Sequence, residues 1–288
     1  MSALQGADPK NADQLIGATL VEAGRLAAGD LERVLSLQRE QGMRFGEAAI
    51  KLGLVSAADV ESALAIQFGY ACPARGASKI NECLAAAYTA TGPQVEELRE
   101  LRGQLVQRWF AVDPTHRSLA IVSATRDEGR SFIAASLAVV FSRLGERTLL
   151  IDADMRHPGQ HQLFGLDNRV GLSTILAGRA GHEAIQQIPV LRDLWVLPAG
   201  AAPPNPQELL ARPPFVRLLG ELALAYDVIL LDCPSATEGA DGKTVAARAG
   251  AALLVVRKNV TRALSTRHVC DDLKQAGAAV VGAVLNDF

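Results

Sequence analysis

From Leu119 onward the chain alternates short, nearly continuous apolar runs with longer amphipathic segments. The apolar runs predict strands over Leu119–Ser123, Thr148–Asp152, Trp195–Pro198, Val228–Asp232, Ala251–Arg257 and Val280–Asn286. Three intervening segments predict helices over Ser131–Leu144, Pro214–Ala225 and Ala263–Ala276. Strands that are apolar throughout are buried on both faces, so the pattern predicts an α/β fold: a mainly parallel sheet with helices on both faces.

The N-terminal part carries an internal repeat. The 24 residues from Leu15 to Gln38 align with the 24 residues from Arg44 to Gln67, at an offset of 29. In each copy an apolar helix ends at a glycine, Gly24 or Gly53, a residue that suits the C-terminal end of a helix. A second helix with one apolar face then begins near Asp30 or Ser56. Two such helix pairs can bury their apolar faces only against each other, which predicts a small all-α domain.

These patterns divide the chain into four parts. We expect a flexible tail over residues 1–13, the helical repeat domain over 14–70, a linker over 71–94 and the α/β domain over 95–288. Within the linker, loop-forming residues interrupt any apolar period, apart from one helical turn around Ala85–Tyr88. The α/β domain opens with a charged helix from Val95 to Trp109.

Composition narrows the function classes. The net charge is −2 and only 5% of the residues are aromatic, so we expect no nucleic-acid partner. The four cysteines form no CxxC pair, and His157 and His161 have no evident third metal ligand beside them. The N-terminus lacks the apolar region of a signal peptide, and no apolar run reaches about 18 residues. These features predict a cytoplasmic protein.

A phosphate-binding loop is indicated between the first strand and its helix. The loop reads ATRDEGRS (residues 124–131) and matches a P-loop at its first small residue, at Gly129 and at Ser131. Such a loop surrounds phosphates with backbone N–H groups, while a hydroxyl binds Mg²⁺. Arg130 replaces the usual lysine, and Asp127 and Glu128 put two carboxylates beside the expected polyphosphate. On this motif alone, an ordinary charged loop remains an equal alternative.

Three aspartates at strand ends strengthen the prediction of a nucleotide site. Asp152 and Asp154 follow the second strand at alternate positions, so both are expected on the same side. Asp232 ends the apolar strand from Val228. Carboxylates at the carboxyl ends of parallel strands, next to a phosphate loop, are what a Mg–nucleotide site requires.

The run from Leu119 to Asp287 resembles the bacterial tyrosine kinases (BY-kinases), P-loop proteins related to the MinD/ParA ATPases that regulate export of extracellular polysaccharides. The resemblance rests on the P-loop, the Walker A′ stretch LLIDADMRHP, the Walker B stretch DVILLDCP, GAAPPNPQELL (200–210) and GAVLND (282–287). The arginine in the P-loop and the N-terminal extension are similar to the exopolysaccharide chain-length determinant branch (EpsG type). The implied fold is a P-loop, MinD/ParA-like sheet preceded by a small all-α domain.

The resemblance implies a role for each matching residue. Asp152 would help to deprotonate an attacking tyrosine hydroxyl, and Arg130 would take the Walker A lysine position, so these two are the expected catalytic residues. Mg²⁺ would be held by Ser131, Asp154 and Asp232. The expected ATP-binding residues are Glu128, Gly129, Arg130, Ser131, Phe132 and Asn286. Catalysis would then consist of positioning and of charge neutralisation at the γ-phosphate.

Partners also follow from the resemblance. Glu96, Arg99 and Arg102 share one face of the charged helix, a pattern that joins BY-kinase subunits into a ring, so a homo-oligomer is expected. The family implies a membrane activator of the polysaccharide copolymerase type, which would place this cytoplasmic chain at the inner membrane. Its three tyrosines do not form the usual C-terminal cluster, so tail autophosphorylation is not expected.

The N-terminal repeat is similar to the N-terminal domain of type II secretion and pilus ATPases (GspE/MshE type). Some of these domains bind cyclic di-GMP through two 24-residue motifs that are separated by five residues. The Arg-Leu-Gly opening of that motif is partly kept as Arg44-Phe45-Gly46, whereas the first copy reads Leu15-Ile16-Gly17. Cyclic di-GMP is therefore a candidate ligand, with a partner-docking module as the alternative.

The leading hypothesis is an ATP/Mg-dependent protein-tyrosine kinase, or kinase-like regulator, of exopolysaccharide chain length and export. A nucleotide-gated scaffold with little phosphotransfer is the alternative that Arg130 and the missing tyrosine cluster favour. A MinD/ParA-like ATPase is a third, although that group typically carries another lysine early in the P-loop, where this chain has ATR.

Overall fold

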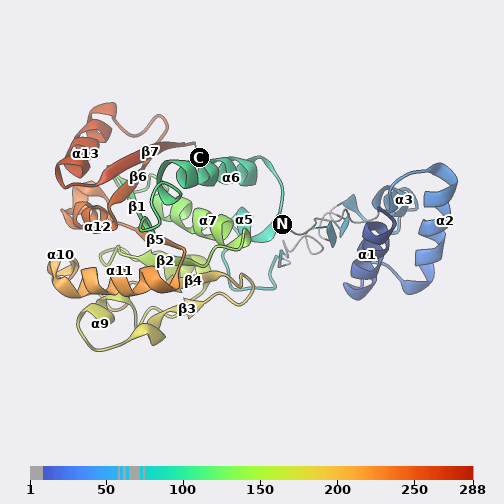
Figure 1. Ribbon diagram of the computed structural model, residues 1–288, viewed down its shortest axis with the longest axis horizontal. Coiled ribbons are helices and arrows are strands. Elements are labelled where there is room, and N and C mark those ends of the chain that lie inside the picture. The colour runs from blue at the N-terminus through green and yellow to red at the C-terminus, as the bar shows by residue number, and fades with distance from the viewer. Residues whose placement is uncertain (1–8, 58, 61–62, 65–71, 74, 288) are drawn as a thin grey trace. The chain divides into compact units, whose positions relative to one another are not determined.

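The computed structural model describes residues 9–57, 59–60, 63–64, 72–73 and 75–287 (Figure 1). The chain forms two compact units, Met1–Ala74 and Arg75–Phe288. None of the described helices combines the length and apolar character that a membrane crossing requires.

The first unit is helical and shows the predicted repeat. Its elements are α1 (Pro9–Glu22), η1 (Ala28–Asp30), α2 (Leu31–Gln41) and α3 (Phe45–Lys51), and residues 57, 59–60 and 63–64 are also helical. The chain turns after α1 at Gly24 (φ +65°) and after α3 at Gly53 (φ +68°), so the two predicted helix ends are confirmed at equivalent positions. Ser56 and Asp59 cap the helix that is predicted to begin near Ser56, with Ser56 N donating to Asp59 Oδ2 over 3.0 Å. The ends of the predicted repeat and domain, Gln67 and Tyr70, lie outside the described residues.

Helix packing in this unit repeats as well. A Cβ atom at Gly17 would lie 2.7 Å from Leu31 Cδ1, and one at Gly46 would lie 2.6 Å from Val60 Cγ1. Each pair is offset from the other by 29 residues, as in the sequence alignment. The glycines therefore let two helices cross closely in both copies. The core consists of Ile16, Leu20, Leu26, Val34, Phe45, Ala48, Ala49, Val55 and Ala63.

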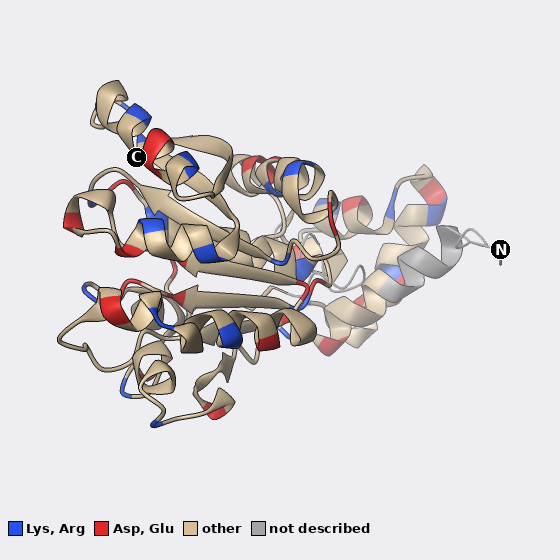
Figure 2. Ribbon diagram, turned by 60° about the vertical axis from the view of Figure 1, so that its left-hand side comes forward, with Lys and Arg blue, Asp and Glu red and all other residues tan. Residues whose placement is uncertain are grey.

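The second unit contains a seven-stranded sheet in the order β3-β4-β2-β5-β1-β6-β7. Its strands are β1 (Ser118–Ser123), β2 (Thr148–Asp152), β3 (Gln186–Gln187), β4 (Leu194–Leu197), β5 (Val228–Asp232), β6 (Ala251–Arg257) and β7 (Ala279–Asn286). All neighbours pair in parallel except β3 and β4, which pair antiparallel. Charged residues in the central strands fall at their ends (Asp152, Asp232 and Arg257). The strand arrows in Figure 2 are accordingly mostly tan.

Helices cover both faces of this sheet, so the predicted fold class is confirmed. Their bounds are α5 (Ala85–Tyr88), α6 (Pro93–Leu105), the π-helical η2 (Val106–Phe110), α7 (Arg130–Arg143), α8 (Gln160–Phe164), α9 (Leu172–Leu176), η3 (His182–Ala184), α10 (Pro206–Ala211), α11 (Pro213–Ala225), η4 (Ala236–Glu238), α12 (Asp241–Ala249) and α13 (Ala263–Gln275). Leu119 and Ile121 pack with α5, α6 and α7, whereas Ala120 and Val122 pack with helices α9–α13. Successive strand residues point to opposite faces, so one apolar strand supplies both layers.

Two of the predicted boundaries are wrong. Residues 9–13 of the predicted tail belong to α1. Residues 75–94 of the predicted linker belong to the second unit, where Ile80, Leu84 and Tyr88 join the hydrophobic core. Their apolar residues come singly or in one short turn, so tertiary packing, rather than a local period, decides their place.

Candidate nucleotide and metal site

The predicted P-loop leads from β1 into α7. Asp127 (φ +58°) and Gly129 (φ +87°) both take the left-handed conformation, and Gly129 is the N-cap of α7. The loop borders a pocket of about 200 Å³, which Ser131, Asp154 and Glu238 also line. The loop thus has the strand–turn–helix form that suits phosphate binding at a helix N-terminus.

Three buried carboxylates meet beside the loop, as the sequence predicts. Asp152 and Asp232 are register partners at the ends of the neighbouring parallel strands β2 and β5. Asp154 follows two residues after Asp152, and its backbone N–H donates to Asp152 Oδ1 over 3.2 Å. The three residues are 0–2% exposed. Sheet pairing therefore joins two carboxylates that are 80 positions apart in the chain.

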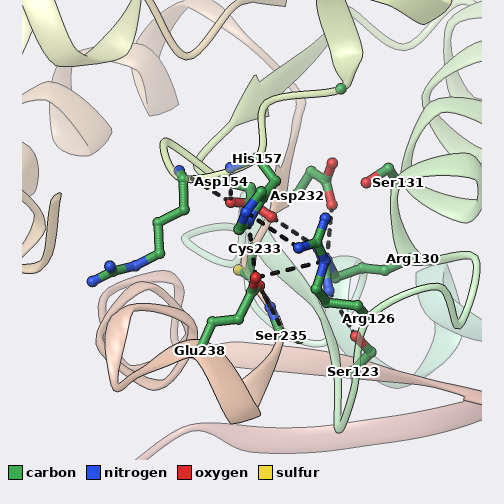
Figure 3. A network of polar contacts seen from close by, with 12 residues as sticks. Ser123, Arg126, Arg130, Ser131, Asp154, His157, Asp232, Cys233, Ser235 and Glu238 are labelled. Atoms are coloured by element: carbon green, nitrogen blue, oxygen red, sulfur yellow. Dashed lines mark hydrogen bonds and ion pairs between the residues drawn. The ribbon is translucent and has the colours of Figure 1, made fainter. Parts of the chain in front are cut away.

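The Arg130 side chain points into this carboxylate cluster (Figure 3). Its Nη2 donates to Asp154 Oδ2 over 3.0 Å, its Nε to Asp232 Oδ1 over 3.2 Å and its Nη1 to Ser123 Oγ over 2.7 Å. Burial works against its charge, yet the Asp232 and Asp154 carboxylates prevail and raise the pKa of Arg130. The planar guanidinium therefore serves as the cation between the two carboxylates that are predicted to hold Mg²⁺.

Asp152 is fully buried in the cluster. Its Oδ2 accepts hydrogen bonds from the backbone N–H groups of Gly159 and Gln160, both over 3.0 Å. Burial, and then the charge of Asp232, raise the pKa of Asp152 well above its ordinary value, although the two backbone donors oppose this. A carboxylate with a raised pKa is suited to taking up a proton.

Asp154 is held from two sides. Its Oδ1 accepts hydrogen bonds from the backbone N–H groups of Arg156 (3.2 Å) and His157 (2.9 Å), while its Oδ2 faces Arg130. Burial raises the pKa of Asp154, and the bond from His157 and the charge of Arg130 counteract that rise. These contacts fix the carboxylate at the mouth of the P-loop pocket.

Two residues predicted to bind ATP brace the loop in this structure. The buried Glu128 carboxylate accepts hydrogen bonds from Ala124 N (3.0 Å), Thr125 Oγ1 (2.7 Å) and Thr261 Oγ1 (2.6 Å). Asn286 Nδ2 donates to the Glu128 carbonyl oxygen over 3.1 Å. The Glu128 carboxylate is thus engaged by its own loop and by Thr261, while the residue still lines the P-loop pocket.

The remaining predicted residues lie at the pocket or close to it. Gly129, Ser131 and Phe132 line the P-loop pocket. Phe132 and Asn286 also line a groove of about 680 Å³ between α6, the start of α7 and β7.

Gln160 joins the site but was missed in the sequence. Its backbone N–H donates to Asp152 Oδ2. Its side-chain Nε2 donates to Asp232 Oδ2 over 2.7 Å and to the Ser131 carbonyl oxygen over 3.0 Å. The side chain is fully buried. The sequence signal was its place just after the Walker A′ stretch, where a polar residue opens the short helix α8.

A second polar group adjoins the carboxylate cluster and shares Asp154 with it. Asp154, His157 and Glu238 offer ligand atoms that all lie within 4.8 Å of one another, so His157 does have potential metal-binding neighbours that the sequence did not reveal. His157 Nδ1 lies 2.8 Å from Glu238 Oε1, and Arg126 approaches His157 Nε2 to 3.2 Å. Arg156 pairs with Asp241 instead: Arg156 Nε donates a hydrogen bond to Asp241 Oδ2 over 2.7 Å.

The three residues predicted to join subunits make contacts within their own unit. Arg99 pairs with Glu96, and Arg102 pairs with Glu146. The Arg102 guanidinium also lies 5.3 Å from the centre of the Phe141 ring. Glu96 is exposed, whereas Arg102 is mostly covered.

The residues present fit a divalent cation with a nucleotide. Asp154 and Asp232 offer the hard oxygen ligands that Mg²⁺ prefers, and Ser131 lies in the first turn of α7 beside them. The Arg130 guanidinium already balances part of the negative charge of these carboxylates. In addition, the buried amide oxygen of Gln160 has no hydrogen-bond partner.

Comparisons with known proteins agree with this geometry. No protein-family model matches the chain. It is 37% identical over 209 residues to EpsB of Ralstonia solanacearum, of which it spans 28%. It is 35% identical to the tyrosine-protein kinase YwqD of Bacillus subtilis over 191 residues, which are 66% of this chain and 80% of YwqD.

Comparisons with solved structures agree with these sequence comparisons. The kinase domain of the Escherichia coli tyrosine kinase ETK matches with a TM-score of 0.63 and 35% identity, over 67% of this chain and 75% of that one. The cell division ATPase MinD of Pyrococcus furiosus matches with a TM-score of 0.52 and 30% identity, over 59% and 71%. The sheet of the second unit is therefore of the P-loop, MinD/ParA-like type.

Proposed function

The chain belongs to the bacterial tyrosine kinase family, and from that membership we propose that it transfers the γ-phosphoryl group of ATP to a tyrosine hydroxyl in a Mg²⁺-dependent reaction. The observation that carries the proposal is the meeting of Asp152, Asp154 and Asp232 beside a P-loop. Phosphoryl transfer needs positioning and charge neutralisation, and these groups suit both.

The proposed roles follow from burial and contacts. Asp152 takes the hydroxyl proton, because burial raises its pKa and its backbone donors fix its orientation. Ser131, Asp154 and Asp232 would hold Mg²⁺, which supplies charge neutralisation on the phosphates when bound. The backbone N–H groups of residues 128–132 would bind the phosphates, and Asn286 would lie toward the base.

Arg130 has two possible positions in this scheme. In the structure it pairs with Asp154 and Asp232, the residues that would hold the metal. Phosphoryl transfer would require its guanidinium to turn toward the phosphates, as the Walker A lysine position implies. Its charge would then stabilise the transferring group.

The biological role that we propose is control of exopolysaccharide chain length and export. The chain would act in the cytoplasm, docked at the inner membrane on a polysaccharide copolymerase-type activator, and would form a homo-oligomer through Glu96, Arg99 and Arg102. To make that contact, Arg102 would have to leave its ion pair with Glu146 and bind a neighbouring subunit. Size measurement in solution with and without ATP, for the wild type and Glu96→Ala, tests the oligomer.

The N-terminal repeat domain, which begins with α1 at Pro9, would link the kinase to a further signal. Its doubled helix packing and the exposed Arg44 at the start of α3 support a partner-docking or cyclic di-GMP-binding module. Calorimetric titration of cyclic di-GMP into the full chain, with Arg44→Ala as the variant, separates these two possibilities.

A nucleotide-gated scaffold is the second candidate, and the Arg130 ion pairs favour it. If these pairs persist when ATP binds, Arg130 cannot assist transfer, and nucleotide would control assembly alone. A MinD/ParA-like ATPase that hydrolyses ATP without a tyrosine acceptor is the third.

Incubation of the purified chain with Mg²⁺ and γ-labelled ATP decides among them. The reaction is run alone and with a cytoplasmic fragment of a polysaccharide copolymerase, for the wild type, Asp152→Ala and the exposed control Asp167→Ala. Phosphotyrosine in the wild type and the control, but not in Asp152→Ala, supports the kinase. ATP-dependent association without transferred label supports the scaffold, and release of labelled phosphate alone supports the ATPase.

A further inference from the structure

One buried acceptor in the site has no hydrogen-bond partner. Among the described residues, four buried side-chain atoms are without one: Ser136 Oγ, Arg143 Nε, Gln160 Oε1 and His161 Nδ1. Of these, only Gln160 belongs to a side chain that contacts residues predicted to hold Mg²⁺. A buried polar atom without a partner is unfavourable unless something else satisfies it.

The orientation of this amide is fixed by its neighbours. Nitrogen and oxygen of a glutamine amide are distinguished through their hydrogen bonds. Both groups facing Nε2, the Asp232 carboxylate and the Ser131 carbonyl, can only accept, at 2.7 Å and 3.0 Å. Turning the amide would place two acceptors against Oε1. Oε1 must therefore face away from them, and it needs a donor.

None of the described side chains supplies this donor. Mg²⁺ sites usually keep several bound waters, because the ion gives up its hydration reluctantly. Such waters are strong O–H donors, and residues around a metal commonly accept from them. Gln160 already links Ser131 and Asp232, two of the three predicted metal-binding residues, while its backbone holds Asp152.

We propose that Gln160 is a positioning residue of the metal site, in which Nε2 orients Asp232 and Oε1 accepts a hydrogen bond from a water bound to the divalent cation. This inference rests on the proposed Mg²⁺–nucleotide function. It adds a residue that acts on metal affinity through water, without direct coordination. It also explains why a glutamine, with a donor and an acceptor on one planar group, occupies this buried position.

Two substitutions at Gln160 distinguish the effect of the Oε1 acceptor from an effect of side-chain packing. Gln160→Met keeps the length of the side chain but removes both the donor and the acceptor. Gln160→Glu keeps an acceptor at Oε1 and adds charge near the cation, but it loses the donor to Asp232. Gln162→Met, at an exposed position on the same helix α8, is the matched control.

The measured quantities are Mn²⁺ affinity by electron paramagnetic resonance in the presence of ADP, and ADP affinity in EDTA. We expect Gln160→Met to weaken Mn²⁺ binding about 10- to 100-fold. ADP binding in EDTA should stay unchanged, Gln160→Glu should bind Mn²⁺ more tightly than Gln160→Met, and the control should match the wild type. A structural role through Nε2 alone would weaken Mn²⁺ binding equally in both Gln160 variants.

Other results overturn the inference in distinguishable ways. If the wild type binds Mn²⁺ with ADP and Gln160→Met binds it equally well, the role of Gln160 is wrong and the proposed function stands. Loss of phosphotransfer in Gln160→Met with unchanged Mn²⁺ affinity would assign Oε1 to the attacking hydroxyl instead. If the wild type binds neither ADP nor Mn²⁺, the proposed function fails and this inference fails with it.

Discussion

Arg130 Nη2 lies 3.0 Å from Asp154 Oδ2, and both side chains are more than nine-tenths buried. The same guanidinium reaches Asp232 over 3.2 Å. Because the two carboxylates are also the predicted metal ligands, the guanidinium and a divalent cation would bind overlapping sets of oxygen atoms. Arg130, at the position of the usual lysine, therefore neutralises two buried carboxylates that a divalent cation would also bind.

Removal of the Arg130 charge should destabilise the second unit and make it depend on divalent cations. Breaking one side of a buried ion pair costs about 3–5 kcal/mol, since it leaves a buried charge without a partner. We expect that loss for Arg130→Met in EDTA, and partial recovery in Mg²⁺. Denaturant unfolding followed by the fluorescence of Trp109 and Trp195, both in the second unit, measures it.

The exposed Arg147, which pairs with Asp227, provides the control. Arg147→Met should lose far less stability and show no response to Mg²⁺. An Arg130→Met protein as stable as the wild type in EDTA would contradict this account of the cluster.

Glu128 should matter more for the shape of the P-loop than for its charge. Glu128→Ala leaves the buried Ala124 N–H without an acceptor, a loss of about 1–3 kcal/mol. Glu128→Gln should be tolerated, because its oxygen can accept from Ala124 while its nitrogen donates to the hydroxyls of Thr125 and Thr261. We expect weaker ATP binding for the alanine variant alone. Fluorescence titration with a labelled ATP checks it, and equal weakening in the glutamine variant would show that the charge itself is needed.

The stability of the second unit should depend on pH through Asp152. Its pKa is raised in the fold, by burial and then by Asp232, from an ordinary value of 3.8. A group that holds its proton more tightly in the folded chain contributes its full stability below the unfolded pKa. That contribution is lost as the pH rises through the folded pKa. The contribution of Asp152 to the free energy of unfolding should therefore fall as the pH rises above about 4.

Asp152→Asn cannot titrate at this position, so its stability should fall less steeply over the same pH range. The raised pKa of Asp154 acts in the same direction in both proteins. Urea unfolding at a series of pH values, followed by tryptophan fluorescence, gives both curves. Parallel curves would mean that Asp152 titrates alike in the folded and unfolded chain.

Close packing at the repeat glycines should make both sensitive to a single methyl group. A Cβ at Gly46 would lie 2.6 Å from a branch of Val60, and one at Gly17 would meet both Leu31 and Phe45. Overpacking of this kind costs about 1–3 kcal/mol. We expect Gly17→Ala and Gly46→Ala to speed amide hydrogen exchange in α2 and α3. Gly29→Ala is the control, because no atom lies within 4 Å of its Cβ position.

Much of this protein could be predicted from local sequence patterns. Strands β2, β5 and β6 have the predicted bounds, because long apolar runs buried on both faces give a strong signal. The three carboxylates were predicted together, since carboxyl ends of parallel strands meet at one edge of the sheet. The 29-residue repeat was predicted from its spacing, and both helix-ending glycines take the expected conformation.

The sequence by itself determined six of the seven described strands, the P-loop and the positions of the acidic groups, because each depends on residues that are close in the chain. Only the tertiary structure decided where the side chains point. Arg130 turns to Asp154 and Asp232, Glu128 binds its own loop, and Gln160 links Ser131 to Asp232. These contacts join segments up to 102 positions apart. Long polar side chains find such partners only when the sheet brings the segments together, since a local period carries no information about distant groups.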